Sequence, residues 1–364
     1  MNIKNILLTG GRSPITLCLA RLFASSGHNV FVADSGWFNI TAFSNCIKKS
    51  YKIPCPKEEN YADSLISIIQ QEKIDFLIPT CEEIFHLSGY LDELRNHCNV
   101  VCDTQEKLLL LHDKWTFYNF LKKLEISSPT TVLGTGEING KIIAKPRFSR
   151  FAAKIHIGNK NPKHAKNEKY IIQEFIKGEQ LCSYGFAKNG ELISNTIYKT
   201  VLTAGKGAGI LLEHIKHEKI DMIVRKIVNE LNFNGQIAFD FIEDSSGHLY
   251  VIECNPRLTT GVCFWEHLSI DILIAQDIPF KENTQIKSIL AAILMYFPTQ
   301  PIKTLKNLHK IIHSKDIICK RSDLKVFFAQ IILAISVTLV AWFNLMTMTA
   351  FSTKDIEYNG GGSQ

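Results

Sequence analysis

The chain lacks any Cys-x-x-Cys pair, although it contains ten cysteines. Its two closest cysteines, Cys98 and Cys102, are separated by three residues and carry no metal-binding signature. Others, such as Cys18 and Cys254, lie in apolar segments, as reduced and buried thiols do in cytoplasmic proteins. The cysteines therefore predict a cytoplasmic protein without a disulfide framework.

Motifs of nucleophilic catalysis are also missing. No Gly-x-Ser-x-Gly sequence occurs, and the twelve histidines lie mostly in polar stretches, such as the one around His214 and His217. The sequence therefore gives no support to a mechanism that uses Ser, Cys or His as the nucleophile.

The Gly-x-Gly-x-x-Gly fingerprint of dinucleotide-binding proteins is absent after the first apolar segment, residues 5–9. Gly10 and Gly11 follow that segment, but Pro14 and Thr16 stand where further glycines are needed. Two interpretations remain: a tight turn from strand to helix, which we favour, or a phosphate site at a helix N-terminus. An NAD(P)-dependent oxidoreductase is accordingly an unfavoured alternative.

Length and composition indicate a globular protein of two or three domains, with 364 residues, 46% of them hydrophobic and 21% charged. The net charge of +6 is concentrated in residues 303–325, which contain seven Lys or Arg and two Asp. Because the remainder is nearly neutral, no nucleic-acid-binding surface is expected. The first apolar run is too brief for a signal peptide, so we expect a strand there.

The first 110 residues alternate between short apolar segments and amphipathic segments. This alternation predicts an α/β domain with a parallel, doubly wound sheet. The expected strands are residues 5–9, 30–33, 74–79 and 100–102, and the expected helices are residues 15–25, 62–71 and 82–96.

A second unit begins near Leu111, where a helix is expected to follow Asp113 and to end before residues 128–130. Further elements are predicted from the apolar pattern. They are strands at 141–145, 154–157, 170–175 and 181–186, and helices at 220–231 and 262–275.

The segment 235–257, GQIAFDFIEDSSGHLYVIECNPR, reads as two apolar strands joined by a turn at residues 244–247. Asp240 lies inside the first strand, and Glu253 and Asn255 end the second. Alternation along a strand places Glu253 and Asn255 on one face, and hairpin pairing can bring Asp240 opposite them.

These oxygen ligands, with Arg257 two residues beyond Asn255, suit Mg²⁺ that carries substrate phosphates. The alternative is a hairpin with solvated polar positions. That alternative conflicts with the free-energy cost of burying unpaired carboxylates inside apolar strands. The sequence therefore favours a metal site formed by Asp240, Glu253 and Asn255.

The hairpin resembles that of the ATP-grasp superfamily, especially ligases related to the large chain of carbamoyl phosphate synthetase and to biotin carboxylase. Glu253, Asn255 and Arg257 match the family's Glu-x-Asn-x-Arg signature. The resemblance covers about three quarters of the chain and weakens beyond about Pro298. It implies a Rossmann-like domain over residues 1–110, an ATP-grasp domain over 111–290 and a mainly helical region over 291–364. The ATP-grasp domain would comprise a lid lobe, about 111–176, and a metal-binding lobe, about 177–290.

The resemblance also implies an ATP site. Lys114 and Lys145 would meet phosphate oxygens as point charges, although a solvated lysine is an equal alternative for Lys114. Lys145 and Arg257 would act in catalysis by offsetting charge that develops during transfer. Glu179 would accept the ribose hydroxyls. The hinge strand that pairs with the adenine edge would consist of Gln173, Glu174, Phe175 and Ile176.

The lid departs from the family pattern. Relatives carry a glycine-rich loop whose N–H groups hold the phosphates, whereas residues 147–153 contain no glycine. Arginine side chains and Ser149 are the available donors. A glycine-rich loop at 204–209 is not a Walker loop, because Lys206 is not followed by Ser or Thr, and we expect it to connect a strand to a helix.

The implied activity is that of an ATP-dependent, ADP-forming ligase that uses Mg²⁺ or Mn²⁺. It would activate a small-molecule carboxylate as an acyl phosphate for attack by an amine or another nucleophile, such as a thiol. The unusual lid keeps open an alternative, a non-catalytic regulatory protein that binds Mg·ATP. The sequence does not identify the carboxylate, the nucleophile or the oligomeric state.

No charged residue lies between Lys325 and Lys354, and residues 326–351 are mostly apolar. The run is long enough to span a bilayer, and the basic segment before it fits a cytoplasmic flank. Its polar members spread around a helix without forming a polar face. Two alternatives follow: a membrane anchor with the ATP site facing the cytoplasm, or a buried C-terminal helix packed by segments such as 286–295, which we favour.

Overall fold

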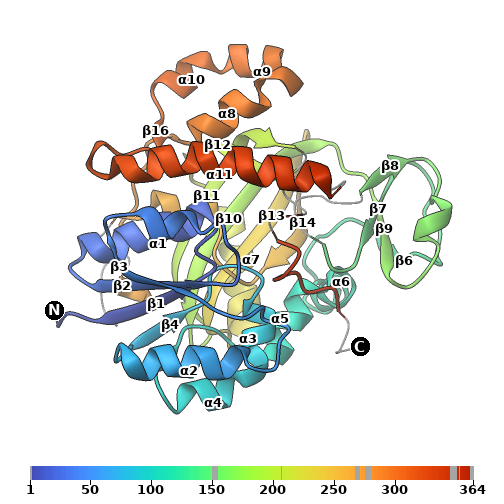
Figure 1. The fold of residues 1–364 in the computed structure, drawn as a ribbon. Helices are drawn as coiled ribbons and strands as arrows, with labels where there is room; N and C mark the ends of the chain where they lie inside the picture. The colour runs from blue at the N-terminus through green and yellow to red at the C-terminus, as the bar shows by residue number, and fades with distance from the viewer. Residues whose placement is uncertain are drawn as a thin grey trace.

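A computed structural model describes residues 2–149, 155–205, 207–266, 271–274, 280–344, 351 and 353–360. Within these residues the strands form three sheets, and a group of helices from the C-terminal quarter lies at one end (Figure 1). The fold is α/β, as expected.

The first sheet is parallel and has the strand order β3-β2-β1-β4-β5. Helix α1 lies on one face of this sheet, and α2 lies on the other (Figure 1). This confirms the doubly wound domain. The strands are β1 (Asn5–Thr9), β2 (Asn29–Asp34), β3 (Ile47–Lys52), β4 (Phe76–Ile78) and β5 (Asn99–Val100), and the helices are α1 (Pro14–Ser25) and α2 (Tyr61–Gln71).

Two features of this domain differ from the sequence predictions. Strand β3 was not predicted, because it is a partly exposed edge strand rich in polar residues. The single helix expected at 82–96 is wrong. That segment is divided into α3 (Ile84–Leu87), the 3₁₀ turn η2 (Ser88–Tyr90) and α4 (Leu91–Arg95).

The second sheet is small and antiparallel, with the order β6-β9-β7-β8. It projects from the body of the molecule (Figure 1), and its own core is limited to a few buried residues, including Ile142 and Ile172. Position 154 of the predicted strand 154–157 lies outside the described residues. The strands are β6 (Thr131–Leu133), β7 (Ile142–Pro146), β8 (His156–Gly158) and β9 (Tyr170–Glu174).

The third sheet has the order β14-β13-β10-β11-β12-β15-β16. Helix α7 (Glu218–Glu230) packs on it because Ile220, Val224, Ile227 and Val228 form a buried stripe at helical spacing. The strands are β10 (Gly178–Lys188), β11 (Glu191–Ala204), β12 (Ala208–Ile215), β13 (Gly235–Asp244), β14 (Leu249–Asn255), β15 (Lys287–Ser288) and β16 (Lys315–Asp316).

Two predictions on this sheet are wrong. The loop 204–209 joins strand β11 to strand β12, and not a strand to a helix; its Lys206 lies outside the described residues. The helix expected at 262–275 is replaced by the 3₁₀ turn η4 (Thr260–Phe264), after which Trp265 bridges to Glu282. Residues 267–270 and position 275 of that segment lie outside the described residues.

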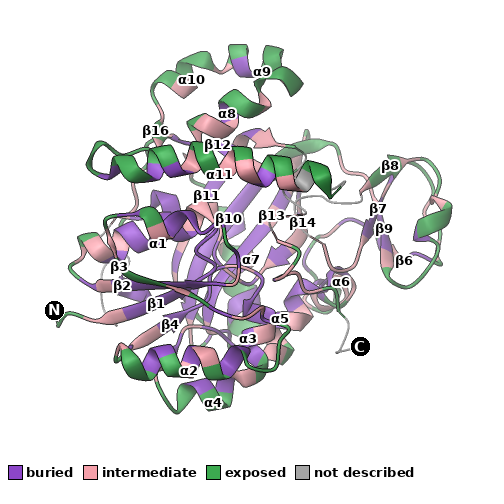
Figure 2. Ribbon diagram, viewed as in Figure 1, coloured by how far each residue is buried: buried purple, intermediate pink, exposed green. Residues whose placement is uncertain are grey.

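Beyond the third sheet the chain is mainly helical. Figure 2 shows that α9 and α10 are largely exposed, as is one side of α11. Helix α11 covers most of the apolar run 326–351, of which residues 345–350 lie outside the described part. The helices are α8 (Leu290–Tyr296), α9 (Pro301–Lys306), α10 (Leu308–Ile312) and α11 (Leu324–Phe343), with 3₁₀ turns η6 (Phe297–Thr299) and η7 (Arg321–Asp323).

Candidate active site

Two carboxylates face each other across the hairpin of β13 and β14. Asp240 and Glu253 are partners in the antiparallel register, and Asn255 pairs with Ala238 two positions along the same face. The register shifts immediately after Asp240, which marks a β-bulge in the ladder. The hairpin pairing predicted from the sequence is therefore confirmed.

The pKa values of the two acids are shifted in opposite directions. Burial raises the pKa of Asp240 to about 7, and the negative charge of Glu253 adds to this effect. Burial would also raise the pKa of Glu253, but the charges of Lys114 and Lys145 hold that pKa below its usual range. The pair thus carries concentrated negative potential that a cation would offset.

Lys114 begins helix α6 (Lys114–Lys123), whose N-terminus is capped by the Asp113 carboxylate through the backbone N–H of Trp115, at 3.0 Å. Its Nζ atom lies 3.4 Å from Oε2 of Glu253 and donates a hydrogen bond to the Ser149 carbonyl oxygen at 3.1 Å. The side chain is buried, so the alternative of a solvated lysine is wrong.

Lys145 lies on β7 and is also buried. Burial lowers the pKa of Lys145 to about 8, while the negative charges of Glu253 and Asp240 act in the opposite direction. The apolar strand therefore delivers a second ammonium group to the side of the acid pair. Three strands from two different sheets (β7, β13 and β14) and helix α6 converge on this point.

Arg257 follows the hairpin and donates to Oδ1 of Asn255 at 3.1 Å and to the Leu258 carbonyl oxygen at 3.3 Å. Its Nη2 atom also lies 3.8 Å from Oε1 of Glu82, which belongs to the first domain. The buried Nε atom of Arg257 has no hydrogen-bond partner among the described residues. The guanidinium group therefore lies where the first domain meets the hairpin, and its Nε–H group can donate a hydrogen bond to a ligand.

The predicted hinge strand corresponds to β9 and the residues after it. The buried side chain of Gln173 donates to Oγ1 of Thr131 at 3.0 Å, inside the small sheet. The backbone N–H of Glu174 donates to the Thr130 carbonyl oxygen at 2.8 Å, and that of Phe175 to the Lys141 carbonyl oxygen at 2.9 Å. These two N–H groups are thus paired inside the small sheet, and the pairing of hinge backbone groups with an adenine edge stays a prediction.

The remaining hinge positions lie closer to solvent. Ile176 is half-buried just before β10. Glu179 is exposed near the start of β10, with a carboxylate oxygen 3.5 Å from Nζ of Lys199. Its carboxylate is thus accessible, and the ribose role stays a prediction.

The lid donors are only partly described. Arg147 forms a bidentate ion pair with Asp113, and Oγ of Ser149 donates to the Pro146 carbonyl oxygen at 3.4 Å. Residues 150–153 lie outside the described part of the chain. In this structure the Arg147 side chain therefore fixes the cap of α6.

Several residues near the site were not foreseen. Glu82 comes from the first domain, and no local motif identifies it. His112 is buried against Phe85, with ring centroids 4.1 Å apart, and burial lowers its pKa well below the usual value. Cys182 of β10 is the register partner of Asp240 on the other side of β13. Each depends on contacts between segments that are distant in the sequence.

Residues 111–261, which contain the hinge, both lysines and the hairpin, match the family described as the ATP-grasp domain. This chain contains an ATP-grasp domain. A comparison with curated proteins finds no match.

Solved structures share the fold of the ATP-grasp domain and of the domain before it. N5-carboxyaminoimidazole synthetase from Staphylococcus aureus matches with a TM-score of 0.62 and 14% identity, covering 83% of this chain and 88% of that one. The biotin carboxylase domain of Hydrogenobacter thermophilus 2-oxoglutarate carboxylase, solved with MgADP and bicarbonate, gives 0.57 and 13%, covering 76% and 68%. L-amino acid ligase from Bacillus licheniformis gives 0.55 and 12%, covering 72% and 69%.

The ATP-grasp site has a donor set that fits Mg²⁺. Among the described residues no group of three His, Cys, Asp or Glu side chains converges, so the protein offers two carboxylates and the Asn255 amide oxygen. Mg²⁺ bound with nucleotides takes few protein ligands and fills its other positions with phosphate oxygens and water. These residues would therefore complete the coordination of Mg²⁺ only together with a phosphorylated ligand.

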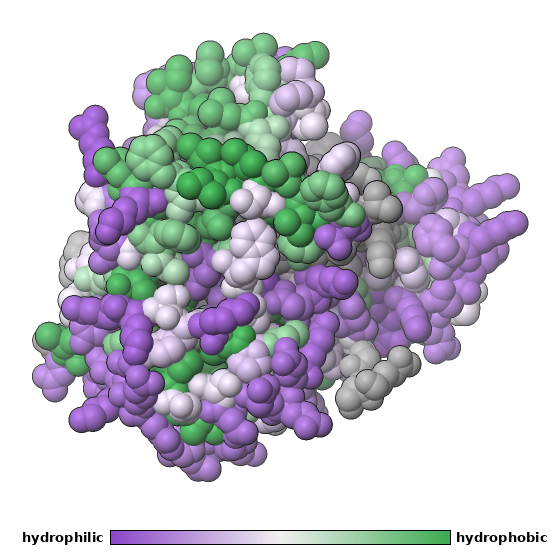
Figure 3. Space-filling view, in the orientation of Figure 1, coloured by the Kyte–Doolittle hydropathy of each residue, from purple (hydrophilic) through white to green (hydrophobic). Residues whose placement is uncertain are grey.

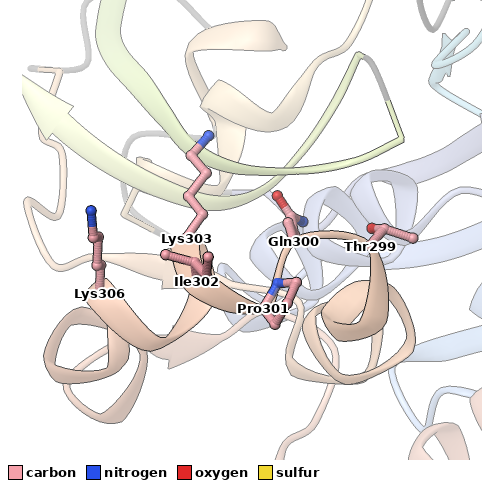
Figure 4. Close-up of a pocket in the computed structure, with 6 residues that line it drawn as sticks. All are labelled: Thr299, Gln300, Pro301, Ile302, Lys303 and Lys306. Atoms are coloured by element: carbon pink, nitrogen blue, oxygen red, sulfur yellow. The ribbon is translucent and has the colours of Figure 1, made fainter.

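A separate surface pocket lies away from the ATP-grasp site. It has a volume of about 410 Å³ and is formed by η6 and α9 (Figure 4). Its lining residues are Thr299, Gln300, Pro301, Ile302, Lys303 and Lys306.

Proposed function

We propose that this protein is an ATP-dependent, ADP-forming ligase that joins a small-molecule carboxylate to a nucleophile, most simply an amine. One observation carries the proposal. The opposed acids Asp240 and Glu253 and the buried ammonium groups of Lys114 and Lys145 meet at one point. Such a mixed cluster holds a phosphate chain by charge, and it is costly to bury without a ligand.

In the proposed reaction a carboxylate oxygen attacks the γ-phosphorus of ATP, and the bond from phosphorus to the β,γ-bridging oxygen breaks to release ADP. The nucleophile then attacks the acyl carbon, and phosphate leaves with the electron pair of the C–O bond. Lys114 and Lys145 would stabilise negative charge on the phosphate oxygens during transfer. Asp240, Glu253 and Asn255 would hold Mg²⁺, which supplies Lewis-acid stabilisation of the β- and γ-phosphates.

Arg257 lies between the hairpin and the first domain, so its unused Nε donor would face the carboxylate or the acyl phosphate. The first domain would then shape the acceptor side through the β4–α3 segment that carries Glu82. The names of the three structurally similar proteins denote different activities, and the structure of this chain does not choose among their substrates.

The test is ADP release from ATP in the presence of pooled amino acids, hydroxy acids and amines, with mass detection of the adduct. Glu253→Gln should lower turnover by about 100-fold or more, because one charge-stabilising group is removed. The matched control is Glu230→Gln, an exposed carboxylate on α7, which should keep full turnover. Near-normal turnover of Glu253→Gln with an unchanged circular dichroism spectrum would refute the assignment.

A non-catalytic protein that binds Mg·ATP is the second candidate. It is favoured by the ion pair of Arg147 with Asp113, which ties a potential lid donor to the cap of α6. Calorimetry with ATP and Mg²⁺ distinguishes the two candidates. Binding that depends on Glu253, together with no ADP release for any pooled acceptor, would establish the second candidate.

A further inference from the structure

Helix α11 presents an uncovered apolar face. Phe328, Ile332 and Trp342 are 61%, 63% and 68% exposed, respectively. The exposed residues recur at spacings of three and four, so they share one side of the helix. That side, the α11 face, comprises Leu324, Phe328, Ile332, Ile335, Leu339 and Trp342.

The opposite side of α11 is the one that packs on the protein. Val326, Ala329 and Val337 are buried, and Val326 belongs to the same core cluster as residues of α1. Helix α11 therefore has two apolar sides, of which the protein covers one. The expectation of a buried C-terminal helix is wrong for the residues described, because the α11 face remains open.

The helices next to α11 extend the apolar surface. Leu294 of α8, Ile302 of α9 and Ile312 of α10 are 74%, 70% and 69% exposed. Figure 3 shows hydrophobic residues gathered over α11 and over this helical group, whereas most of the lower part of the same view is hydrophilic. A contiguous patch of this kind marks an interaction surface.

Basic residues lie on or next to the helices that carry the patch. The segment 303–325 has a net charge of +5, and six of its seven Lys and Arg side chains are exposed. Lys303 and Lys306 line the pocket on α9 (Figure 4), while Arg321 and Lys325 flank the start of α11. A second copy of the chain would bring the same positive charge against this surface, which disfavours self-association. An anionic bilayer complements both the charge and the apolar area.

The start of α11 and the described segment after it are both attached to the first domain. At the start, Nη2 of Arg21 on α1 pairs with Oδ2 of Asp323 at 2.7 Å, and both side chains are buried. Beyond the end, Asp355 accepts hydrogen bonds from Arg12 at 2.5 and 2.8 Å and from Ser35 at 2.7 Å.

The segment after Asp355 stays on the protein as well. Ile356 is buried, and the Tyr358 ring lies 5.8 Å from that of Phe85 and 5.9 Å from that of Phe148. Residues 321–340 are long and apolar enough to cross a membrane. A crossing helix would carry this tail to the other side and break all of these contacts.

We propose that α11 lies in the plane of a membrane interface, with the α11 face inserted into an anionic bilayer and the basic residues of 303–325 on the headgroups. The protein thereby docks on the lipid surface without spanning it. This inference is independent of the chemistry at Asp240 and Glu253.

The test uses full-length protein in vesicle flotation, with phosphatidylcholine alone or with about 30% phosphatidylserine. We expect at least about tenfold stronger partition onto the anionic vesicles, which weakens as salt screens the basic residues. The triple variant I332Q/I335Q/L339Q should reduce partition by about tenfold or more, because the inserted apolar area is lost. The matched control I3Q/I157Q/M222Q changes three exposed apolar residues outside the patch and should bind as the unchanged protein does.

Four results would overturn the proposal. The first is no preference for anionic vesicles, and the second is equal loss of binding in the triple variant and its control. The third is a lipid-free dimer that the triple variant converts to a monomer, which would assign the patch to a second copy. The fourth is an epitope tag after Gln364 that becomes protected from external protease on vesicle binding, which would show a crossing helix. Circular dichroism spectra verify that both triple variants are folded.

Discussion

Nζ of Lys114 lies 3.4 Å from Oε2 of Glu253, and this contact joins the first residue of α6 to the end of β14. Lys114 also bonds the carbonyl oxygen of Ser149, which precedes the undescribed part of the lid. The lysine thus connects the small sheet, the large sheet and the acid pair. A ligand that binds the Lys114 ammonium group would alter both contacts together.

Replacing Lys114 by methionine should weaken ATP binding by about 10- to 100-fold, since a charge-assisted contact to phosphate contributes roughly 1.5–3 kcal/mol. Lys114→Arg retains the charge and should recover part of the affinity. Titration calorimetry with ATP and Mg²⁺ measures both. The control is Lys123→Met at the exposed end of the same helix, and equal losses for the two methionine variants would contradict the role of Lys114.

Asp240→Asn should separate stability from activity. Without a metal ion the Asp240 and Glu253 carboxylates repel each other, so the neutral amide should raise the melting temperature in EDTA by about 2–4 °C. ADP release should fall by about 100-fold or more, because a ligand for Mg²⁺ is lost. Thermal melts with EDTA and with Mg²⁺ measure the first effect. A lower melting temperature in EDTA would show that the two acids do not oppose each other.

The buried pair of Arg21 and Asp323 should make stability depend on acid pH. Burial alone would raise the pKa of Asp323, but hydrogen bonds from Ser44 and Arg21 hold it below its usual value. A lowered pKa means that the stabilisation is complete above the unfolded pKa of about 4 and is lost as the pH falls through the folded value. Asp323→Asn should cost about 3–5 kcal/mol near pH 7, because the Arg21 charge stays buried without its partner.

Urea unfolding from about pH 7 down to about pH 3 tests this expectation, and the difference between the unchanged protein and Asp323→Asn should shrink with falling pH. The exposed Asp92→Asn on α4 serves as the control. A difference that stays constant over the range would contradict the assignment.

Gly178 begins β10 directly after the hinge, and a Cβ atom there would lie 2.1 Å from the Glu243 carbonyl oxygen. Gly178→Ala should therefore lower the free energy of unfolding by about 1–3 kcal/mol, because backbone must shift to relieve the overlap. At Gly89 a Cβ would approach only the flexible end of Gln105, at 3.3 Å, so Gly89→Ala should change stability little. Urea unfolding compares the two variants, and equal stabilities would show that the hinge backbone accommodates a side chain.

The sequence was most informative where neighbouring residues determine their own contacts. Alternating apolar segments predicted the parallel domain, and the short turn after Asp244 set the hairpin that brings Asp240 opposite Glu253. The polar edge strand β3 was not predicted, because its pairing with β2, and not its composition, makes it a strand. The helix expected at 82–96 is interrupted around Gly89, since tertiary packing overrode its apolar period.

The candidate site was predictable only for residues inside motifs. Glu82 and His112 come near it because the first domain packs against the hairpin and α6, and no spacing in one segment specifies such a contact. The pairing of the Glu174 and Phe175 N–H groups could not be predicted for a similar reason. Their partners, the carbonyl groups of Thr130 and Lys141, lie just before β6 and just before β7, and these pairings follow from the arrangement of the small sheet.

Arg12 and Asp355 are separated by 343 positions, so their ion pair joins the first loop of the chain to its last described segment. During synthesis the first domain emerges early and can fold around its own parallel sheet, with Arg12 held by Asp34 and by the hydroxyl group of Ser35. The second acidic partner, Asp355, is synthesised 343 positions later. The contact between Arg12 and Asp355 therefore forms only after residue 355 has left the ribosome, and a nascent chain stalled before that point would leave the segment after α11 unattached.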